Sequence, residues 1–140
     1  MIVKEVDYQQ YQVEIQRIRT EVFVIEQSVP EDIEYDDRDV LCHHVLAFDG
    51  DIAVATGRID TDQGGKIGRV SVLDGERSHG IGEQVMQALH RIARRAGLNS
   101  VRLNAQVSAL PFYQALGYQA EGAVFMEAGI PHQAMARAIE

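Results

Sequence analysis

The stretch from Arg69 to Leu89, RVSVLDGERSHGIGEQVMQAL, changes its pattern within a few residues. Alternating apolar residues first indicate a strand, because successive side chains of a strand point to opposite faces. From Ile81 the apolar residues recur at helical spacing instead, and Gly97 offers that helix a left-handed end. Gly80 and Gly82 stand between the two patterns. The chain therefore predicts a strand that passes through a glycine bend directly into a helix.

Strand and helix patterns alternate along the rest of the chain without a repeat or a linker. We expect strands near residues 1–6, 44–48, 52–59, 67–73, 101–105, 118–127 and 133–139, and helices near 7–22, 81–96 and 109–116. Pro111 should lie in the first turn of the last helix. Residues 1–140 are thus predicted to form one α/β (α+β) domain, a mixed central sheet flanked by helices in the order β-α-β-β-β-α-β-α-β-β.

Composition limits the classes of partner. The 140 residues carry 21 acidic and 13 basic side chains, a formal net charge of −8, which disfavours nucleic acid and favours a cationic partner. No apolar run is long enough to span a membrane, and no basic start precedes a hydrophobic segment. We therefore expect a cytoplasmic protein without a membrane partner. Cys42 is the only cysteine and excludes an internal disulfide.

Acidic residues crowd the segment that follows Pro30. Such a density of charge resists regular packing and predicts an exposed loop. Its negative field would favour a cationic molecule nearby. The acids are Glu31, Asp32, Glu34, Asp36, Asp37 and Asp39.

The glycine bend has the features of an anion site. A helix N-terminus presents backbone N–H groups without helical partners, and glycine lets an anion approach them closely. Arg77, just before the glycines, can add a charged contact. The bend is not a P-loop, because Gly-Lys-Ser/Thr is absent, and Val85 stands where the dinucleotide motif needs a small residue. The alternative is that the glycines serve only the turn.

The segment Arg77-Ser-His-Gly-Ile-Gly82 resembles the Arg/Gln-x-x-Gly-x-Gly/Ala loop of the GNAT N-acetyltransferase superfamily. The expected element order is similar to the GNAT fold, and AQVSALPFYQALGY is similar to that family's segment ending in Tyr-x-x-x-Gly-Phe/Tyr. VFVIEQSVP and EAGIPH resemble one branch of small bacterial members. The resemblance implies acetyl-CoA as co-substrate, with its pyrophosphate at the glycine loop.

The resemblance also implies roles for particular residues. The strand backbone near Val72 would pair with the pantetheine arm and supply an oxyanion contact, and Tyr113 would donate a proton to the leaving thiolate. Without the resemblance, Tyr113 reads as a core aromatic. Gln106 departs from the asparagine that many members carry. The residues expected to bind the cofactor are Val70, Ser71, Val72, Arg77, Ser78, His79, Gly80, Ile81, Gly82, Gln106 and Phe112.

Acetyl transfer to an amine also needs a proton acceptor, because an alkyl amine is mostly protonated at pH 7. Glu34 is the expected base, with a solvated surface acid as the alternative. Glu26, His44 and His132 are the expected acceptor contacts. Glu26 can equally brace its loop, and His132 can be an ordinary histidine of the turn joining the last two strands.

The triplet Cys42-His43-His44 offers two adjacent kinds of zinc ligand, but no third and fourth ligand follow at recognisable spacing, so we expect no metal. The predicted activity is direct acetyl transfer from acetyl-CoA to a primary amine of a small molecule, a peptide or a protein. The alternative is a non-catalytic acyl-CoA-binding sensor or interaction module. A homodimer is compatible with the resemblance.

Overall fold

The computed structural model describes residues 1–139, apart from the side chains of residues 32 and 33. The strands are β1 (Ile2–Val6), β2 (His43–Asp49), β3 (Ile52–Asp60), β4 (Lys66–Val72), β5 (Ser100–Gln106), β6 (Gln119–Glu127) and β7 (Ile130–Ala138). The helices are α1 (Gln12–Arg19), α2 (Glu31–Glu34), α3 (Ile81–Arg95) and α4 (Leu110–Ala115). The predicted order of strands and longer helices is confirmed, and the short α2 is an addition that the sequence pattern did not predict.

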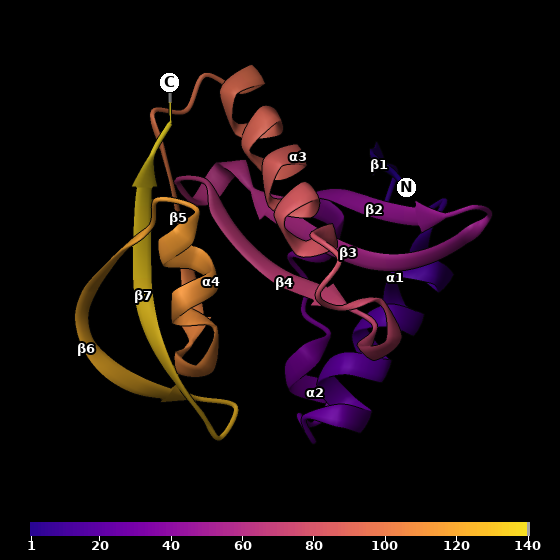
Figure 1. The fold of residues 1–140 in the computed structure, drawn as a ribbon, viewed down its shortest axis with the longest axis horizontal. Coiled ribbons are helices and arrows are strands. Elements are labelled where there is room, and N and C mark those ends of the chain that lie inside the picture. The colour runs from indigo at the N-terminus through magenta and orange to yellow at the C-terminus, as the bar shows by residue number, and fades with distance from the viewer. Residues whose placement is uncertain (140) are drawn as a thin grey trace.

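The seven strands form one mixed sheet in the order β1-β2-β3-β4-β5-β7-β6. All neighbouring pairs are antiparallel except β4 and β5, which run parallel. Only Lys66 with Arg102 and Ile67 with Leu103 pair across that junction, so the two strands diverge beyond Ile67. Figure 1 shows the result: β5, β7 and β6 form an arm that leans away from β4. The divergence opens space between the two arms.

Strand β4 is irregular where it leaves β5. Its pairing with β3 shifts register between Thr56 and Arg58, and Arg69 has a positive φ of 54°. A non-glycine residue in the left-handed region is uncommon and marks a bulge that redirects the strand. The bulge lies in the part of β4 that faces the opening between the arms.

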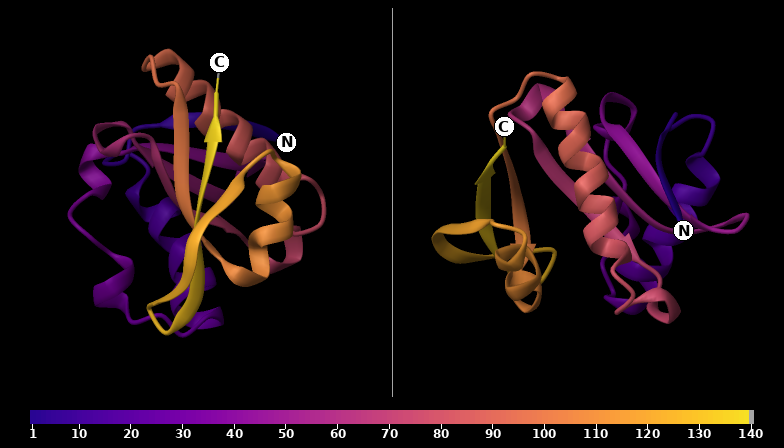
Figure 2. Two further views of the ribbon diagram at one scale, coloured as in Figure 1. Left: turned by 90° about the vertical axis from the view of Figure 1, so that its left-hand side faces the viewer. Right: turned by 45° about the horizontal axis from the view of Figure 1, so that its top comes forward.

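Helices cover both faces of the sheet, as Figure 2 shows from two further sides. Alternate residues of β2 point to the two faces: Val45 and Ala47 join the core beneath α3, whereas Leu46 packs with Ile15 and Ile18 of α1. Gly57 of β3 lets α3 approach closely, because a Cβ at Gly57 would lie 3.0 Å from the side chains of both Val85 and Leu89. Within residues 1–139, no helix is long and apolar enough to cross a membrane.

Strand β7 begins earlier than predicted. It starts at Ile130 rather than near Gln133, directly after a tight turn in which Ala128 and Gly129 both have positive φ. Pro131 is tolerated because it is the second residue of the strand. His132 therefore lies within a strand, paired with both neighbours, and its expected position in a loop is wrong.

Candidate active site

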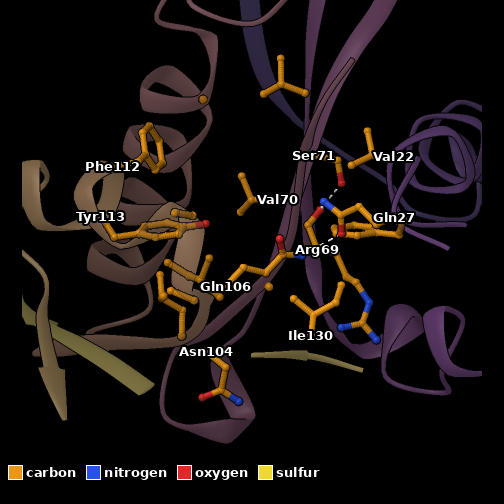
Figure 3. Close-up of a pocket in the computed structure, with 18 of the residues that line it drawn as sticks. Val22, Gln27, Arg69, Val70, Ser71, Asn104, Gln106, Phe112, Tyr113 and Ile130 are labelled. Carbon is orange, nitrogen blue, oxygen red and sulfur yellow. Dashed lines mark hydrogen bonds between the residues drawn. The ribbon is translucent and has the colours of Figure 1, made fainter. Parts of the chain in front are cut away.

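A single large cavity of about 1000 Å³ occupies the opening between the diverging arms. One end is lined by the loop before α3, and the other by α2 and the start of β7. Figure 3 shows its middle, where Tyr113 of α4 faces the β4 residues Arg69, Val70 and Ser71. Elements far apart in the sequence thus form two ends of one cavity.

The loop before α3 exposes backbone donors at the first end. Ser78 and Gly80 both have positive φ, and Gly80 is the N-cap residue of α3 without any side-chain cap. A Cβ at Gly80 would meet no heavy atom within 4 Å, so the space above the helix start is open. The first N–H groups of this 15-residue helix and its dipole together favour an anion there. His79, expected among the cofactor contacts, does not line the cavity, whereas Ser78, Gly80 and Gly82 do.

Arg77 is oriented differently from the expectation. Its guanidinium forms a bidentate pair with Glu26, at 2.7 and 2.9 Å, and its Nε donates to the Val72 carbonyl at 2.9 Å. Glu26 ends the π-helical turn that continues α1, from Thr20 to Glu26. Of the two interpretations of Glu26, the contacts favour a brace, but the carboxylate binds Arg77 in the loop before α3 instead of bracing its own loop as predicted.

Phe112 and Gln106 line the middle of the cavity. A Cβ at Gly82 would lie 3.3 Å from the Phe112 ring, so this glycine leaves room for α4 to pack against the start of α3. The Gln106 amide donates to Gln27 Oε1 at 2.8 Å, across the cavity from β5 to the end of the π-helical turn. The Gln106 side chain therefore links β5 to the residue that follows the π-helical turn.

Tyr113 projects into the cavity from α4. Figure 3 shows its hydroxyl pointing toward Val70 and Gln106. Burial raises the pKa of this hydroxyl to about 12, and among residues 1–139 no group forms a hydrogen bond with it. The ring packs edge-on against Phe112 and Tyr118. A neutral, unpaired hydroxyl aimed into a cavity is suited to donate a proton to a bound molecule.

The acidic segment is not the exposed loop that its composition predicts. Glu34 ends the helix α2 and is only 3% exposed. Its Oε1 accepts a bond from Arg19 Nε at 2.6 Å, and its Oε2 lies 3.1 Å from Arg69 Nε. Burial raises the pKa of Glu34, against the opposing charges of these two arginines. Glu34 lines the cavity, but both of its oxygens are held by guanidinium groups, which argues against its expected role as base.

Asp36 and Asp39 are neutralised by arginines in the same way. Arg58 forms a bidentate pair with Asp36 at 2.8 Å and contacts Asp39 at 2.7 Å, and Arg19 holds Asp39 from the other side. Hydrogen bonds from Arg58 lower the pKa of Asp36 to about 2. Burial alone would raise the pKa of Asp39, but the two arginines outweigh it and lower that pKa. The segment therefore contributes little free negative charge to the cavity. The side chain of Asp32 lies outside the described residues.

His44, an expected acceptor contact, lies away from the cavity. It is 1% exposed, donates from Nε2 to the Asp39 carbonyl at 2.8 Å and stacks on Tyr8. Burial lowers its pKa and raises that of the Cys42 thiol to about 11, which disfavours a reactive thiolate. Among residues 1–139, apart from the side chains of residues 32 and 33, no three His, Cys, Asp or Glu side chains gather in a way that could hold a metal ion.

His132 does line the cavity. It pairs with Gln106 of β5 on one side and Phe125 of β6 on the other, and it is 7% exposed. Glu127, the last residue of β6, lies beside it and also lines the cavity. The sequence reasoning missed Glu127, although it opens the EAGIPH motif and the hairpin turn between the two residues could have placed them together.

Comparison with known proteins identifies the family. Residues 4–139 match the model of the acetyltransferase (GNAT) domain. The chain belongs to the GNAT acetyltransferase family. It is 41% identical over 120 residues to a Bacillus subtilis protein named uncharacterized N-acetyltransferase YjcF, a match that covers 84% of this chain and 86% of the relative.

Solved structures agree with this assignment. An acyl-CoA N-acyltransferase from Pseudomonas aeruginosa superposes with a TM-score of 0.87 at 30% identity, covering 99% of this chain and 100% of the other. Escherichia coli ElaA gives a TM-score of 0.85 at 30% identity, over 98% and 99% of the two chains. The mixed sheet with its diverging β4 and β5 is thus the fold of the GNAT acyltransferases.

Proposed function

We propose that this protein transfers the acetyl group of acetyl-CoA directly to a primary amine of a small molecule, a peptide or a protein. One observation carries the proposal: a single cavity joins the uncapped N-terminus of α3 to the unpaired hydroxyl of Tyr113. The anion site and the proton donor that thioester chemistry needs therefore open into the same space. The acyl-CoA named for the Pseudomonas relative supports this choice of donor.

The loop at Gly80 and the strand β4 can each be compared with the part of acetyl-CoA that would lie against it. The N–H groups that follow Gly80 suit a pyrophosphate, and the open space above Gly80 leaves room for it. Val70, Ser71 and Val72 would offer backbone groups to the pantetheine arm where β4 has left β5. Acetyl-CoA would supply a thioester already activated for attack. Arg77 would act through its bond to Glu26, holding the loop rather than the phosphates.

The role proposed for Tyr113 is that of the acid. When the carbon–sulfur bond breaks, the leaving thiolate needs a proton, and a neutral phenol with a raised pKa holds its proton until then. A phenylalanine at this position keeps the ring contacts with Phe112 and Tyr118 and removes only the hydroxyl group that carries the proton.

The deciding experiment is a thiol-release assay with acetyl-CoA and a panel of ethanolamine, spermidine, glucosamine, alanine and a lysine-containing peptide. We expect amine-dependent release of CoA with at least one of these, and the acetylated amine as product. A non-catalytic sensor, the other candidate, would bind acetyl-CoA in calorimetry but release CoA only at the rate of background hydrolysis. That outcome would overturn the proposed function and leave the binding loop intact.

A further inference from the structure

We propose that His132 is the base that takes a proton from the acceptor amine, and that Glu127 positions the amine against it. This inference rests on the proposed function, since it assigns roles within the amine-accepting end of the same cavity. It follows from the tautomer of His132, from the rigidity of its surroundings and from the carboxylate that faces it.

The tautomer is determined by one hydrogen bond. His132 Nδ1 lies 2.7 Å from the carbonyl oxygen of Ile130. A carbonyl oxygen can only accept, so Nδ1 carries the proton of the neutral ring. Nε2 therefore holds a lone pair, which is the requirement for a base. The second nitrogen of a catalytic histidine is commonly oriented in this way by a backbone carbonyl.

The ring of His132 is held rigidly. Phe125 stacks on it, with the ring centroids 6.1 Å apart and the planes inclined by 24°. Ala128 and Gly129, both at positive φ, form the tight turn that sets Glu127 opposite Ile130. The base and its neighbour thus lie on paired strands of one hairpin, and strands hold side chains more precisely than loops do.

Glu127 faces the free nitrogen. Its Oε2 lies 3.5 Å from His132 Nε2, and the carboxylate is half exposed, so molecules in the cavity can reach it. A lone pair and a carboxylate oxygen both accept hydrogen bonds, so the gap between them favours a donor with several protons. A primary ammonium group has three. The pair therefore selects an amine in its protonated form and offers it a place to leave one proton.

The groups around His132 do not compete with it for the role of base. On β5 its cross-strand neighbour is the neutral Gln106, and on β6 its neighbours are Phe125 and Glu127. Three other carboxylates that line the cavity are bound to guanidinium groups: Glu26 to Arg77, Glu34 to Arg19 and Arg69, and Asp36 to Arg58 and Arg69. Glu76 and Glu83 line the cavity at its other end, beside the start of α3. Lys66 also lines the cavity, on β4. A base must have a free lone pair within reach of the substrate, and His132 Nε2 meets that condition.

The amine loses two protons during the transfer, one before and one after it attacks the acetyl carbon. The ammonium gives one proton to His132 Nε2, and the imidazolium that forms keeps that proton in a hydrogen bond to the Glu127 carboxylate. The neutral amine then forms a bond to the acetyl carbon as the carbon–sulfur bond breaks, and Tyr113 gives its proton to the sulfur. The second proton lost by the nitrogen restores the Tyr113 hydroxyl. His132 releases its proton to solvent, so one proton leaves for each acetyl group transferred.

The first test needs no substrate. Nitrogen-15 spectra of the full protein at neutral pH should show His132 with its proton on Nδ1, its signals being the ones missing from a His132→Gln variant. A proton on Nε2 would point a donor into the cavity and overturn the proposal.

The second test uses the best amine of the thiol-release panel. We expect His132→Gln to lower kcat about a hundredfold at pH 7 without changing the KM for acetyl-CoA. The deficit should shrink as the pH is raised toward 10, because more of the amine is already neutral in solution. Glu127→Gln should lower kcat about tenfold. A structural defect would give a loss that is independent of pH.

The matched control is His43→Gln. His43 is another histidine beside a glutamate, with Nδ1 3.0 Å from Glu5 Oε2, but it lies on β2 outside the cavity and should leave kcat unchanged. If wild type transfers acetyl groups and His132→Gln does so equally fast, the inference fails while the proposed function stands. If wild type releases no CoA with any amine of the panel, the proposed function itself fails.

Discussion

The two ends of the cavity are lined by different kinds of group, backbone at one end and side chains at the other. The donor end consists of backbone: Gly80 at positive φ, and N–H groups at the start of α3 that no side chain caps. The acceptor end consists of side chains, with three arginines bound to three carboxylates beneath α2 and a histidine facing a glutamate on the β6–β7 hairpin. A backbone site depends on conformation and a side-chain site on pairing, so substitutions at the two ends should fail in different ways.

The acceptor end should fail by loss of stability. Arg19 is 1% exposed and bound to both Glu34 and Asp39, so Arg19→Met removes one of the two guanidinium partners of each buried carboxylate and leaves only Arg69 beside Glu34 and Arg58 beside Asp39. We expect the free energy of unfolding to fall by about 4 kcal/mol, measured by urea denaturation. Arg17→Met, in the same helix, removes one hydrogen bond from an exposed side chain to the Ala53 carbonyl and should cost about 1 kcal/mol. Equal losses in the two variants would show that the ion pairs contribute little.

The donor end should fail by loss of binding. Gly80→Asp places a side chain at a φ of 76° and a negative charge at the start of α3. We expect acetyl-CoA affinity to fall more than about a hundredfold, because strain and like charge together cost about 3 kcal/mol. Isothermal titration calorimetry measures this affinity. Gly75→Asp is the control, since Gly75 is exposed, has no positive φ and leaves open space for a Cβ. Tight binding by Gly80→Asp would refute the loop assignment.

Tyr113 lies where the two ends meet, so its loss should affect neither stability nor binding. Tyr113→Phe should lower kcat about a hundredfold, which is a typical contribution of a general acid. The KM for acetyl-CoA should stay constant, because the ring contacts with Phe112 and Tyr118 remain. Steady-state kinetics with the best amine of the panel measure both. If Tyr113→Phe keeps the full kcat, the thiolate is protonated by water and not by Tyr113.

The contrast between the ends also explains what the sequence could predict. Periodicity identified the strands and α3, since each buries one face against the sheet. The glycine loop was recognised because positive φ and close approach require glycine at fixed positions, and such requirements are visible in one short segment. Local sequence patterns therefore predict most of the fold and the glycine loop at the donor end.

The acceptor end could not be predicted in the same way. Arg58 and Asp36 are 22 residues apart, and Arg69 and Glu34 are 35 apart, so nothing local links them. The acids that follow Pro30 are visible in the sequence, but the arginines that bind them come from α1, β3 and β4. Pro131 predicts a break in the chain and a loop position for His132, but proline also fits the beginning of a strand, which is where it lies. Pairing across the sheet, which decides both cases, appears only in three dimensions.

A pH prediction tests a third, buried region outside the cavity. Arg137 donates to His90 Nδ1 at 2.8 Å, and burial together with that charge lowers the pKa of His90 to about 4. The unfolded chain takes up this proton near pH 6.5, so it binds more protons than the folded chain between pH 6.5 and 4. Stability must therefore fall as the pH falls through this range, by about 2 kcal/mol at pH 5 for His90 alone.

The measurement is urea denaturation at pH 7.5 and pH 5 for wild type and His90→Gln. His44, whose pKa burial also lowers, acts in the same direction, and Glu34, whose pKa burial raises, acts in the opposite one. The difference between the two proteins therefore isolates His90. Identical pH dependence in both would mean that His90 is protonated as readily in the folded state as in the unfolded one.

The smallest expected effect decides between the two interpretations of Glu26. Glu26→Gln removes the charge opposite Arg77, and because both side chains are more than a third exposed, stability should change by less than about 1 kcal/mol. If Glu26 is a brace, the KM for acetyl-CoA should rise slightly and that for the amine should stay constant, because the loop loosens while the His132 end is untouched. If Glu26 binds the acceptor, the amine KM should rise instead. Steady-state kinetics with each substrate varied in turn distinguish a contact that shapes the donor end from one that belongs to the acceptor end.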